Sequence, residues 1–116
     1  MTIVRGVLAR VFVDDVDLAL PIYQRLSGDV EARRFRFGEV DLAWVGSFLL
    51  LKVGPDQRAN YERVATLLVE DIDEASAAVR ATGGVILEEP AEAPNGPRMI
   101  ARHADGAVFE YIQPDE

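Results

Sequence analysis

The chain has 116 residues, which suits a single domain or one domain built from two small halves. Apolar residues make up 49% and charged residues 28%, proportions that exclude a disordered, collagen-like or coiled-coil chain. The sequence has no cysteine and one histidine, which excludes a disulfide framework, a thiolate zinc site and a catalytic pair of histidines. The net charge of −8 repels phosphate backbones, so nucleic acid is not an expected partner.

The hydropathy of the chain gives no sign of a membrane partner. No window approaches the ~20 apolar residues that span a bilayer. The N-terminal residues 1–5 lack the long apolar core of a signal peptide. We therefore expect a soluble, cytoplasmic protein, and its acidic balance favours a cation over an anion as a ligand.

The first half of the chain reads as a strand, a helix and three more strands. A β-prone run at 7–13 stops at Asp14, and Asp15 can cap the helix that follows. Gly28 can end this helix. The apolar residues at helical spacing are Val16, Ala19, Leu20, Tyr23 and Leu26. The three strand signals that follow lie at 32–37, 40–45 and 48–53.

The second half repeats this order. A strand is predicted at 64–69, and Asp71 followed by Glu74 forms a capping box for the next helix. Gly83 and Gly84 end that helix. The remaining strands are predicted at 85–87, 98–102 and 107–112, with an acidic, proline-containing loop over 88–96.

The two halves are also similar in their residues. The run from Val13 to Ala19 matches the run from Val69 to Ala75 at an offset of 56 residues, and Gly28 matches Gly84 at the same offset. Such a repeat predicts two copies of one supersecondary unit, residues 7–54 and residues 63–113. The expected fold class is α+β, with tandem βαβββ modules.

A tandem βαβββ repeat with these sequences resembles the vicinal oxygen chelate superfamily, the group of glyoxalases, bleomycin-resistance proteins and extradiol dioxygenases. The most specific segments are residues 13–23 and residues 103–110. Ile22 stands where the family usually has Phe, and His103 and Ala104 stand in place of Asp and Pro. The resemblance implies one domain over residues 1–116, a cup-shaped mixed sheet and a homodimer.

The resemblance also indicates which residues would have to bind a metal. In the metal enzymes of this superfamily, four strand positions project ligands into the cup. Transferred to this chain they fall on Leu8, Leu51, Val64 and Glu110. A register shift of two residues brings in Arg10 or Thr66, which are no better ligands. Because one carboxylate cannot hold a catalytic divalent ion, we expect no metal, no cofactor and no assigned catalytic residue.

The expected ligand site is therefore the cup itself. Glu110 is predicted in mid-strand on the concave face, with Phe109 and Tyr111 pointing toward the helix. Its carboxylate serves as a polar handle for a ligand, as half of a purely structural ion pair with Arg10, or as a metal ligand or base. The lone His103 is predicted to be exposed and idle. The candidate ligand-binding residues are Arg10, Phe12, Trp44, Leu51, Thr66 and Glu110.

Three function classes follow from these observations. The leading hypothesis is a metal-free small-molecule-binding protein, most concretely one that sequesters an antibiotic or another cationic or aromatic natural product. The alternative is an enzyme of this superfamily, a lyase, isomerase or dioxygenase, with a divergent active site. The third is a dimeric interaction module with no ligand, in which the aromatic residues serve only core packing or a dimer seam.

Overall fold

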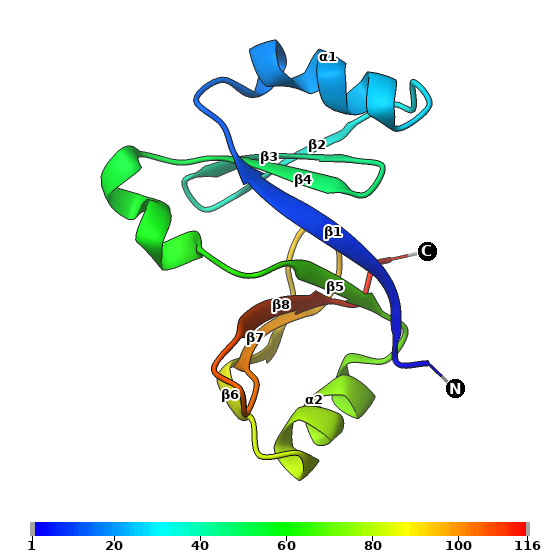
Figure 1. Ribbon diagram of the computed structural model, residues 1–116, viewed down its shortest axis with the longest axis vertical. Helices are drawn as coiled ribbons and strands as arrows, with labels where there is room; N and C mark the ends of the chain where they lie inside the picture. The colour runs from blue at the N-terminus through cyan, green and yellow to red at the C-terminus, as the bar shows by residue number, and fades with distance from the viewer. Residues whose placement is uncertain (1, 116) are drawn as a thin grey trace. The chain divides into compact units, whose positions relative to one another are not determined.

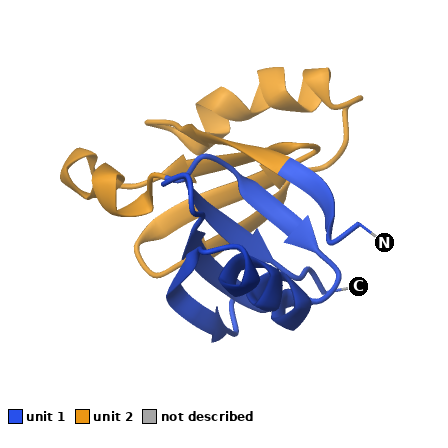
Figure 2. Ribbon diagram, turned by 60° about the horizontal axis from the view of Figure 1, so that its bottom comes forward, with its two compact units in different colours: residues 1–7, 63–116 blue, residues 8–62 orange. Residues whose placement is uncertain are grey.

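The structure, a computed structural model, describes residues 2–115, and they form two compact units (Figure 2). Unit 2 comprises residues 8–62, and unit 1 combines the segment up to Val7 with the chain from Arg63 onward. Each unit is described by itself below. No helix within residues 2–115 has both the length and the apolar composition that crossing a bilayer requires.

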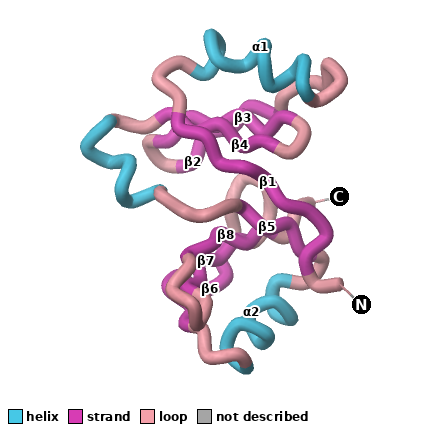
Figure 3. The backbone as a smooth tube through the Cα atoms, viewed as in Figure 1, coloured by secondary structure: helices cyan, strands magenta, loops and turns pink. Residues whose placement is uncertain are grey.

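Unit 2 holds one sheet covered by a helix. Its strand order is β2-β3-β4-β1, in which β1 and β4 run parallel and the other neighbours antiparallel. Helix α1 packs against β3 and β4 (Figures 1 and 3). The elements are β1 (Val4–Phe12, which begins in unit 1), α1 (Val16–Leu26), β2 (Arg33–Phe37), β3 (Val40–Val45), β4 (Phe48–Lys52) and the 3₁₀ helix η1 (Pro55–Tyr61).

Unit 1 repeats this arrangement. Its strand order is β5-β8-β7-β6, again with the first and last strands of the repeat parallel and the other neighbours antiparallel. The elements are β5 (Thr66–Val69), α2 (Ile72–Ala81), β6 (Val85–Ala91), β7 (Arg98–Arg102) and β8 (Val108–Ile112). The predicted α+β class with tandem βαβββ order is confirmed. The superposition of residues 7–54 on residues 63–113 stays a prediction.

Both α-helices, α1 and α2, begin where their aspartate caps were predicted. The Asp15 carboxylate accepts a hydrogen bond from the backbone N–H of Leu18 at 3.1 Å. The Asp71 carboxylate accepts from the N–H groups of Asp73 and Glu74 at 3.0 and 3.2 Å. The first N–H groups of a helix have no partner inside it, so these carboxylates complete their hydrogen bonding and offset the helix dipole.

Strand alternation separates the helix side of each sheet from its other face. In unit 2 the core under α1 is built around Val16, Ala43, Val45 and Leu50. In unit 1 the core under α2 includes Leu67, Val69, Met99, Ala101 and Tyr111. Residues of the opposite parity therefore lie on the faces turned away from the helices. These faces carry Arg10, Phe12, Trp44 and Leu51 in unit 2, and Thr66, Arg98, Ile100 and Glu110 in unit 1.

Several elements differ from their prediction, and β1 begins at Val4, three residues earlier than expected. Residues 88–96 were expected to be a loop, but β6 continues to Ala91, because Pro90 lies on the outermost strand of its sheet, where the pairing with β7 is irregular and a missing N–H is tolerated. The turn signal at Gly54 and Pro55 opens the longer helix η1. Strand β5 begins at Thr66, two residues later than predicted.

The loop between β6 and β7 leads into the strand that carries Arg98, and it is anchored by backbone hydrogen bonds to the segment after β8. Gln113 N–H donates to the Pro97 carbonyl at 2.9 Å, and Asp115 N–H donates to the Asn95 carbonyl at 3.1 Å. Gly96 has φ +115°, and a Cβ atom there would overlap the Gln113 carbonyl oxygen. This close approach requires glycine.

We expect Gly96→Ala to be far more destabilising than Gly106→Ala. Gly106 also has a positive φ, +93°, but a Cβ atom there meets open space. Gly106→Ala should therefore lower the free energy of unfolding only by about 1–2 kcal/mol, the cost of placing a side chain on a backbone with positive φ. Gly96→Ala adds a backbone overlap and should cost at least about 2 kcal/mol more. Urea unfolding measures both losses, and equal losses would contradict the proposed contact.

Candidate functional site

The site is centred on Glu110, in the middle of β8. The strand register places Glu110 beside Thr66 of β5 on one side and Ile100 of β7 on the other. Glu110 is only 8% exposed, and Thr66 is fully buried. A charged carboxylate in such a place is stable only when donors or cations compensate it.

The Glu110 carboxylate has a donor on each oxygen. The Thr66 hydroxyl donates to Oε1 at 2.7 Å, and Arg98 Nε donates to Oε2 at 3.0 Å. The side chain of Arg98 is 14% exposed, so both members of this ion pair are shielded from water. Charge-assisted hydrogen bonds of this kind fix the orientation of a carboxylate as well as its charge. Glu110 is therefore a preorganised anionic group.

The network continues toward the surface with charges of alternating sign. Arg98 Nη1 also donates to Glu88 Oε1 at 3.2 Å, and Arg63 Nη2 lies 3.9 Å from Glu88 Oε2. The side chain of Glu88 is 55% exposed. Arg98 thus forms ion pairs with two carboxylates, the buried one of Glu110 and the more exposed one of Glu88.

Sequence reasoning did not select Arg98 as a site residue. The signal that identifies it is strand parity, because Arg98 lies two residues before Ile100, which faces Glu110 across the β7–β8 pair. Residues two apart on a strand share a face, and a diagonal neighbour is within reach of a long side chain. Knowing the register of β7 against β8 was necessary to use that signal.

The candidate residues of unit 2 share one face of its sheet. Phe12 of β1 is in register with Leu51 of β4, and Leu51 is 2% exposed. Arg10 Nη2 donates to the Tyr61 carbonyl at the end of η1, at 2.7 Å. The Trp44 indole N–H donates to the Gly46 carbonyl at 3.0 Å. Helix η1, which the sequence did not predict, therefore anchors Arg10.

Phe12 also contacts helix η1, through the charged side chain of Arg58. The Arg58 guanidinium carbon lies 5.5 Å from the centre of the Phe12 ring, a cation–π distance. Arg58 Nη2 also donates to Asp14 at 2.8 Å. The structure thus brings Thr66 and Glu110 together in unit 1, and Phe12 and Leu51 in unit 2. An Arg10–Glu110 ion pair and a site using both groups stay predictions.

The four positions that correspond to metal ligands in the superfamily do not fit a metal here. Leu8 and Leu51 are each 2% exposed and have no lone pairs to donate. Val64 lies before β5 and is 62% exposed, so Thr66 takes the place beside Glu110. The described residues contain no group of three or more His, Cys, Asp or Glu side chains that could hold an ion. One carboxylate, already accepting from Thr66 and Arg98, is the donor set that remains.

His103 is only partly exposed, contrary to the prediction, and whether it has a function stays untested. Its ring is half-buried and stacks on Phe109 with ring centres 4.5 Å apart. Its Nε2 lies 2.6 Å from the hydroxyl oxygen of Tyr111. Burial raises the pKa of the Tyr111 phenol above its ordinary value of 10.0, so the phenol stays protonated near neutral pH. Phe109 and Tyr111 do face the α2 side, as predicted.

Comparison with known proteins gives structural relatives. No family model matches the chain, and no curated protein matches it by sequence. An uncharacterized protein from Methanosarcina mazei is 30% identical with a TM-score of 0.88, over 99% of this chain and 95% of that one. Methylmalonyl-CoA epimerase from Mycobacterium tuberculosis is 15% identical with a TM-score of 0.75, over 100% of this chain and 92% of that one.

A variant of the Streptomyces coelicolor methylmalonyl-CoA epimerase, solved in complex with 2-nitronate-propionyl-CoA, is also similar. It is 16% identical with a TM-score of 0.69, and the match covers 100% of this chain and 99% of that one. At this level of identity, the likeness to the epimerases concerns the fold. The expected fold is thereby confirmed over nearly the whole chain.

We expect the Thr66 hydroxyl to stabilise the fold through Glu110. Thr66→Val keeps the shape of the side chain but removes the donor, and should lower the free energy of unfolding by about 1.5–3 kcal/mol. Thr66→Ser keeps the hydroxyl and should cost only about 1 kcal/mol for the lost methyl group. In a Glu110→Gln background, the cost of Thr66→Val should fall to about 1 kcal/mol, because the charge is gone. Urea unfolding of the series tests this, and a larger loss for Ser than for Val would contradict it.

Proposed function

The chain has the fold of the vicinal oxygen chelate superfamily, and on that basis we propose that it is a metal-free small-molecule-binding protein. Its ligand is a cationic or aromatic organic molecule, and sequestration of an antibiotic is the most concrete form of this function. The observation that carries the proposal is the way in which the Glu110 carboxylate is held by its neighbours. Where the metal enzymes of the superfamily place an ion, this chain has a single carboxylate held by Thr66 and Arg98.

The donor set favours binding over metal-dependent chemistry. Two of the positions for metal ligands are buried leucines, which shape a surface but cannot polarise a substrate. A carboxylate that accepts from a guanidinium and a hydroxyl is held in a fixed orientation, which suits a fixed contact for a ligand. Glu110 therefore suits a ligand that needs one polar contact.

The chemistry of the candidate residues supports the ligand class. Glu110 offers an anionic acceptor, and the net charge of −8 raises the local concentration of cations. Trp44 and Phe12 supply aromatic rings on one face of unit 2, and aromatic rings bind planar or cationic groups. We further propose that the protein acts as a homodimer, which sedimentation at micromolar concentration checks.

The second candidate function is an isomerase. The similarity of the fold to methylmalonyl-CoA epimerases favours it over the other enzyme classes of the superfamily. Epimerisation removes and returns a proton next to a carbonyl, so an active protein exchanges that proton with solvent deuterium. Incubation with methylmalonyl-CoA in deuterated water, with and without added divalent metals, measures this by NMR. Catalytic exchange that is lost in Glu110→Gln would favour the isomerase over the binding protein.

A thermal-shift screen identifies the ligand class. Any molecule that binds only the native state raises the midpoint of unfolding by mass action. The panel contains divalent metals, bleomycin, and cationic and neutral aromatic natural products at equal concentration. A response confined to organic cations supports the proposal, whereas a response confined to a metal supports the enzyme alternative.

We expect the protein to be indifferent to metal removal. Because the described residues offer one carboxylate where a catalytic ion needs about three ligands, EDTA should leave the unfolding midpoint and the affinity for any screened ligand unchanged. Elemental analysis of the purified protein should find less than one equivalent of zinc, nickel, manganese or iron. A stoichiometric metal that Glu110→Gln releases would overturn this expectation.

We expect Glu110→Gln to weaken the binding of a cationic ligand by about 1.5–3 kcal/mol, the scale of a charge-assisted hydrogen bond. Titration calorimetry with the strongest cation from the screen measures the loss. Glu92→Gln is the matched control, since it removes the same charge from an exposed position and should leave the affinity nearly unchanged. If both variants bind as the parent does, Glu110 has a purely structural role.

A further inference from the structure

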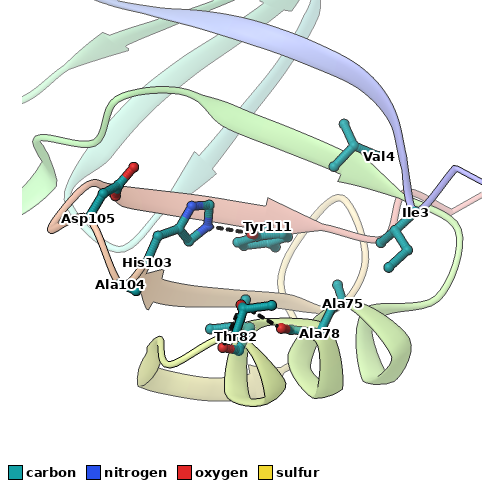
Figure 4. Close-up of a pocket in the computed structure, with 10 residues that line it drawn as sticks. Ile3, Val4, Ala75, Ala78, Thr82, His103, Ala104, Asp105 and Tyr111 are labelled. Carbon is teal, nitrogen blue, oxygen red and sulfur yellow. Dashed lines mark hydrogen bonds between the residues drawn. The ribbon is translucent and has the colours of Figure 1, made fainter.

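Unit 1 has a groove on the side of its sheet opposite Glu110, between α2 and the sheet. Its volume is about 440 Å³, within the range of small-molecule sites. The walls are mostly apolar, with Ile3, Val4, Ala75 and Val79 among them. Figure 4 shows His103 and Tyr111 facing each other, with Ile3 toward the other end of the groove. The groove thus combines an apolar body with one polar end.

The groove arises from the residues of this repeat and is not required by the fold. At the offset of 56 residues, Val79 of α2 corresponds to Tyr23 of α1. The Tyr23 ring packs edge-on against Phe48 at 5.0 Å between centres, so an aromatic ring takes the corresponding place under α1. Ala78 corresponds to Ile22, which is 56% exposed and does not fill this space. The shorter Val79 therefore leaves the space that the Tyr23 ring fills in the other repeat.

The polar end offers both a donor and an acceptor. The His103 ring nitrogens and the Tyr111 hydroxyl carry both hydrogens and lone pairs, and their mutual hydrogen bond uses one of each. Whichever tautomer His103 adopts, one hydrogen and one lone pair of the pair are left for another partner. A hydroxyl group of a ligand could both donate to and accept from this end of the groove. A carbonyl group of a ligand could accept the hydrogen that the pair has left.

The charges around the groove restrict the class of ligand further. Among the described residues that line the groove, Asp105 carries a charge and none is a lysine or arginine. Asp105 is exposed and accepts a hydrogen bond from Ala107 N–H at 2.9 Å, so an ion pair with it would be weak. An anion would meet this carboxylate and the net charge of −8. The hydrogen-bonded pair of the half-buried His103 and the buried Tyr111 is therefore the main polar feature of the groove.

We propose that this groove is a second binding site, for a small neutral aromatic or alicyclic molecule that carries one hydroxyl or carbonyl group. The ring lies against Ala75, Ala78 and Val79, and the polar group completes the hydrogen bonding of the His103–Tyr111 pair. The site is independent of the proposed function at Glu110, because it uses the other face of the sheet of unit 1.

Benzyl alcohol is the probe, and toluene, benzylamine and benzoate are its comparators with the same ring. Titration followed by ¹H–¹⁵N NMR should give saturable shifts at α2 and at the turn around His103. Benzyl alcohol should bind at least threefold tighter than toluene, and tighter than either ion. Toluene binding as tightly would remove the role of the polar end, and tighter benzylamine would overturn the neutral class. Absence of saturable shifts would overturn the site.

Variants that fill the groove test its location. Ala78→Ile and Thr82→Leu import the residues that α1 has at the corresponding positions, and each should weaken benzyl alcohol at least tenfold. Ala77→Ile is the matched control, because Ala77 is exposed and does not line the groove. Equal effects of Ala78→Ile and Ala77→Ile would place the probe elsewhere. With two filling variants, a folding defect in one leaves the test intact.

The polar end is tested by Tyr111→Phe, which removes the phenol oxygen and keeps the ring. This variant should reduce the preference for benzyl alcohol over toluene at least twofold while leaving the affinity for toluene unchanged. A purely structural tyrosine would weaken both probes equally, which would contradict the proposal. Glu110→Gln should leave both titrations unchanged, so failure of the proposed function does not affect this result.

Discussion

The parallel pairing of the first and last strands in each repeat is the constraint on which the candidate sites depend. Parallel neighbours cannot be joined by a hairpin, so the chain must leave the sheet through a helix and return through further strands. In unit 1 this pairing places Thr66 of β5 directly beside Glu110 of β8. It also directs Tyr111, the next residue along β8, to the face that α2 covers. One strand thereby contributes to a polar network on one face and to a groove on the other.

The identity of the side chains, and not the fold, decides which chemistry such a frame supports. The frame is shared with methylmalonyl-CoA epimerases. In this chain Leu8 and Leu51 are buried in unit 2, and in unit 1 Glu110 is engaged by Thr66 and Arg98. A carboxylate held in this way contributes charge and direction without a metal. Glu110 and the His103–Tyr111 pair thus lie on opposite faces of the sheet of unit 1, the first in an ion-pair network and the second in a mostly apolar groove.

The repeats differ in how their helices pack against their sheets. The aspartate caps are retained at Asp15 and Asp71, because every helix must complete the hydrogen bonding of its first turn. Under the helices, however, Tyr23 in one repeat corresponds to Val79 in the other. A cap is constrained by backbone geometry alone, whereas packing under a helix admits several solutions of different volume. Such divergence is how one repeat can gain a groove without losing its fold.

The sequence by itself determined the order of the elements, the helix caps and the side of the strand on which Phe109, Glu110 and Tyr111 lie. These features depend on residues within a few positions of one another, through helical and strand periodicity and cap chemistry. Only the tertiary structure decided that Arg98 pairs with Glu110, that His103 meets Tyr111 and that β6 extends to Ala91. Those features depend on the register between strands and on the space beneath a helix, which residues distant in the sequence set together.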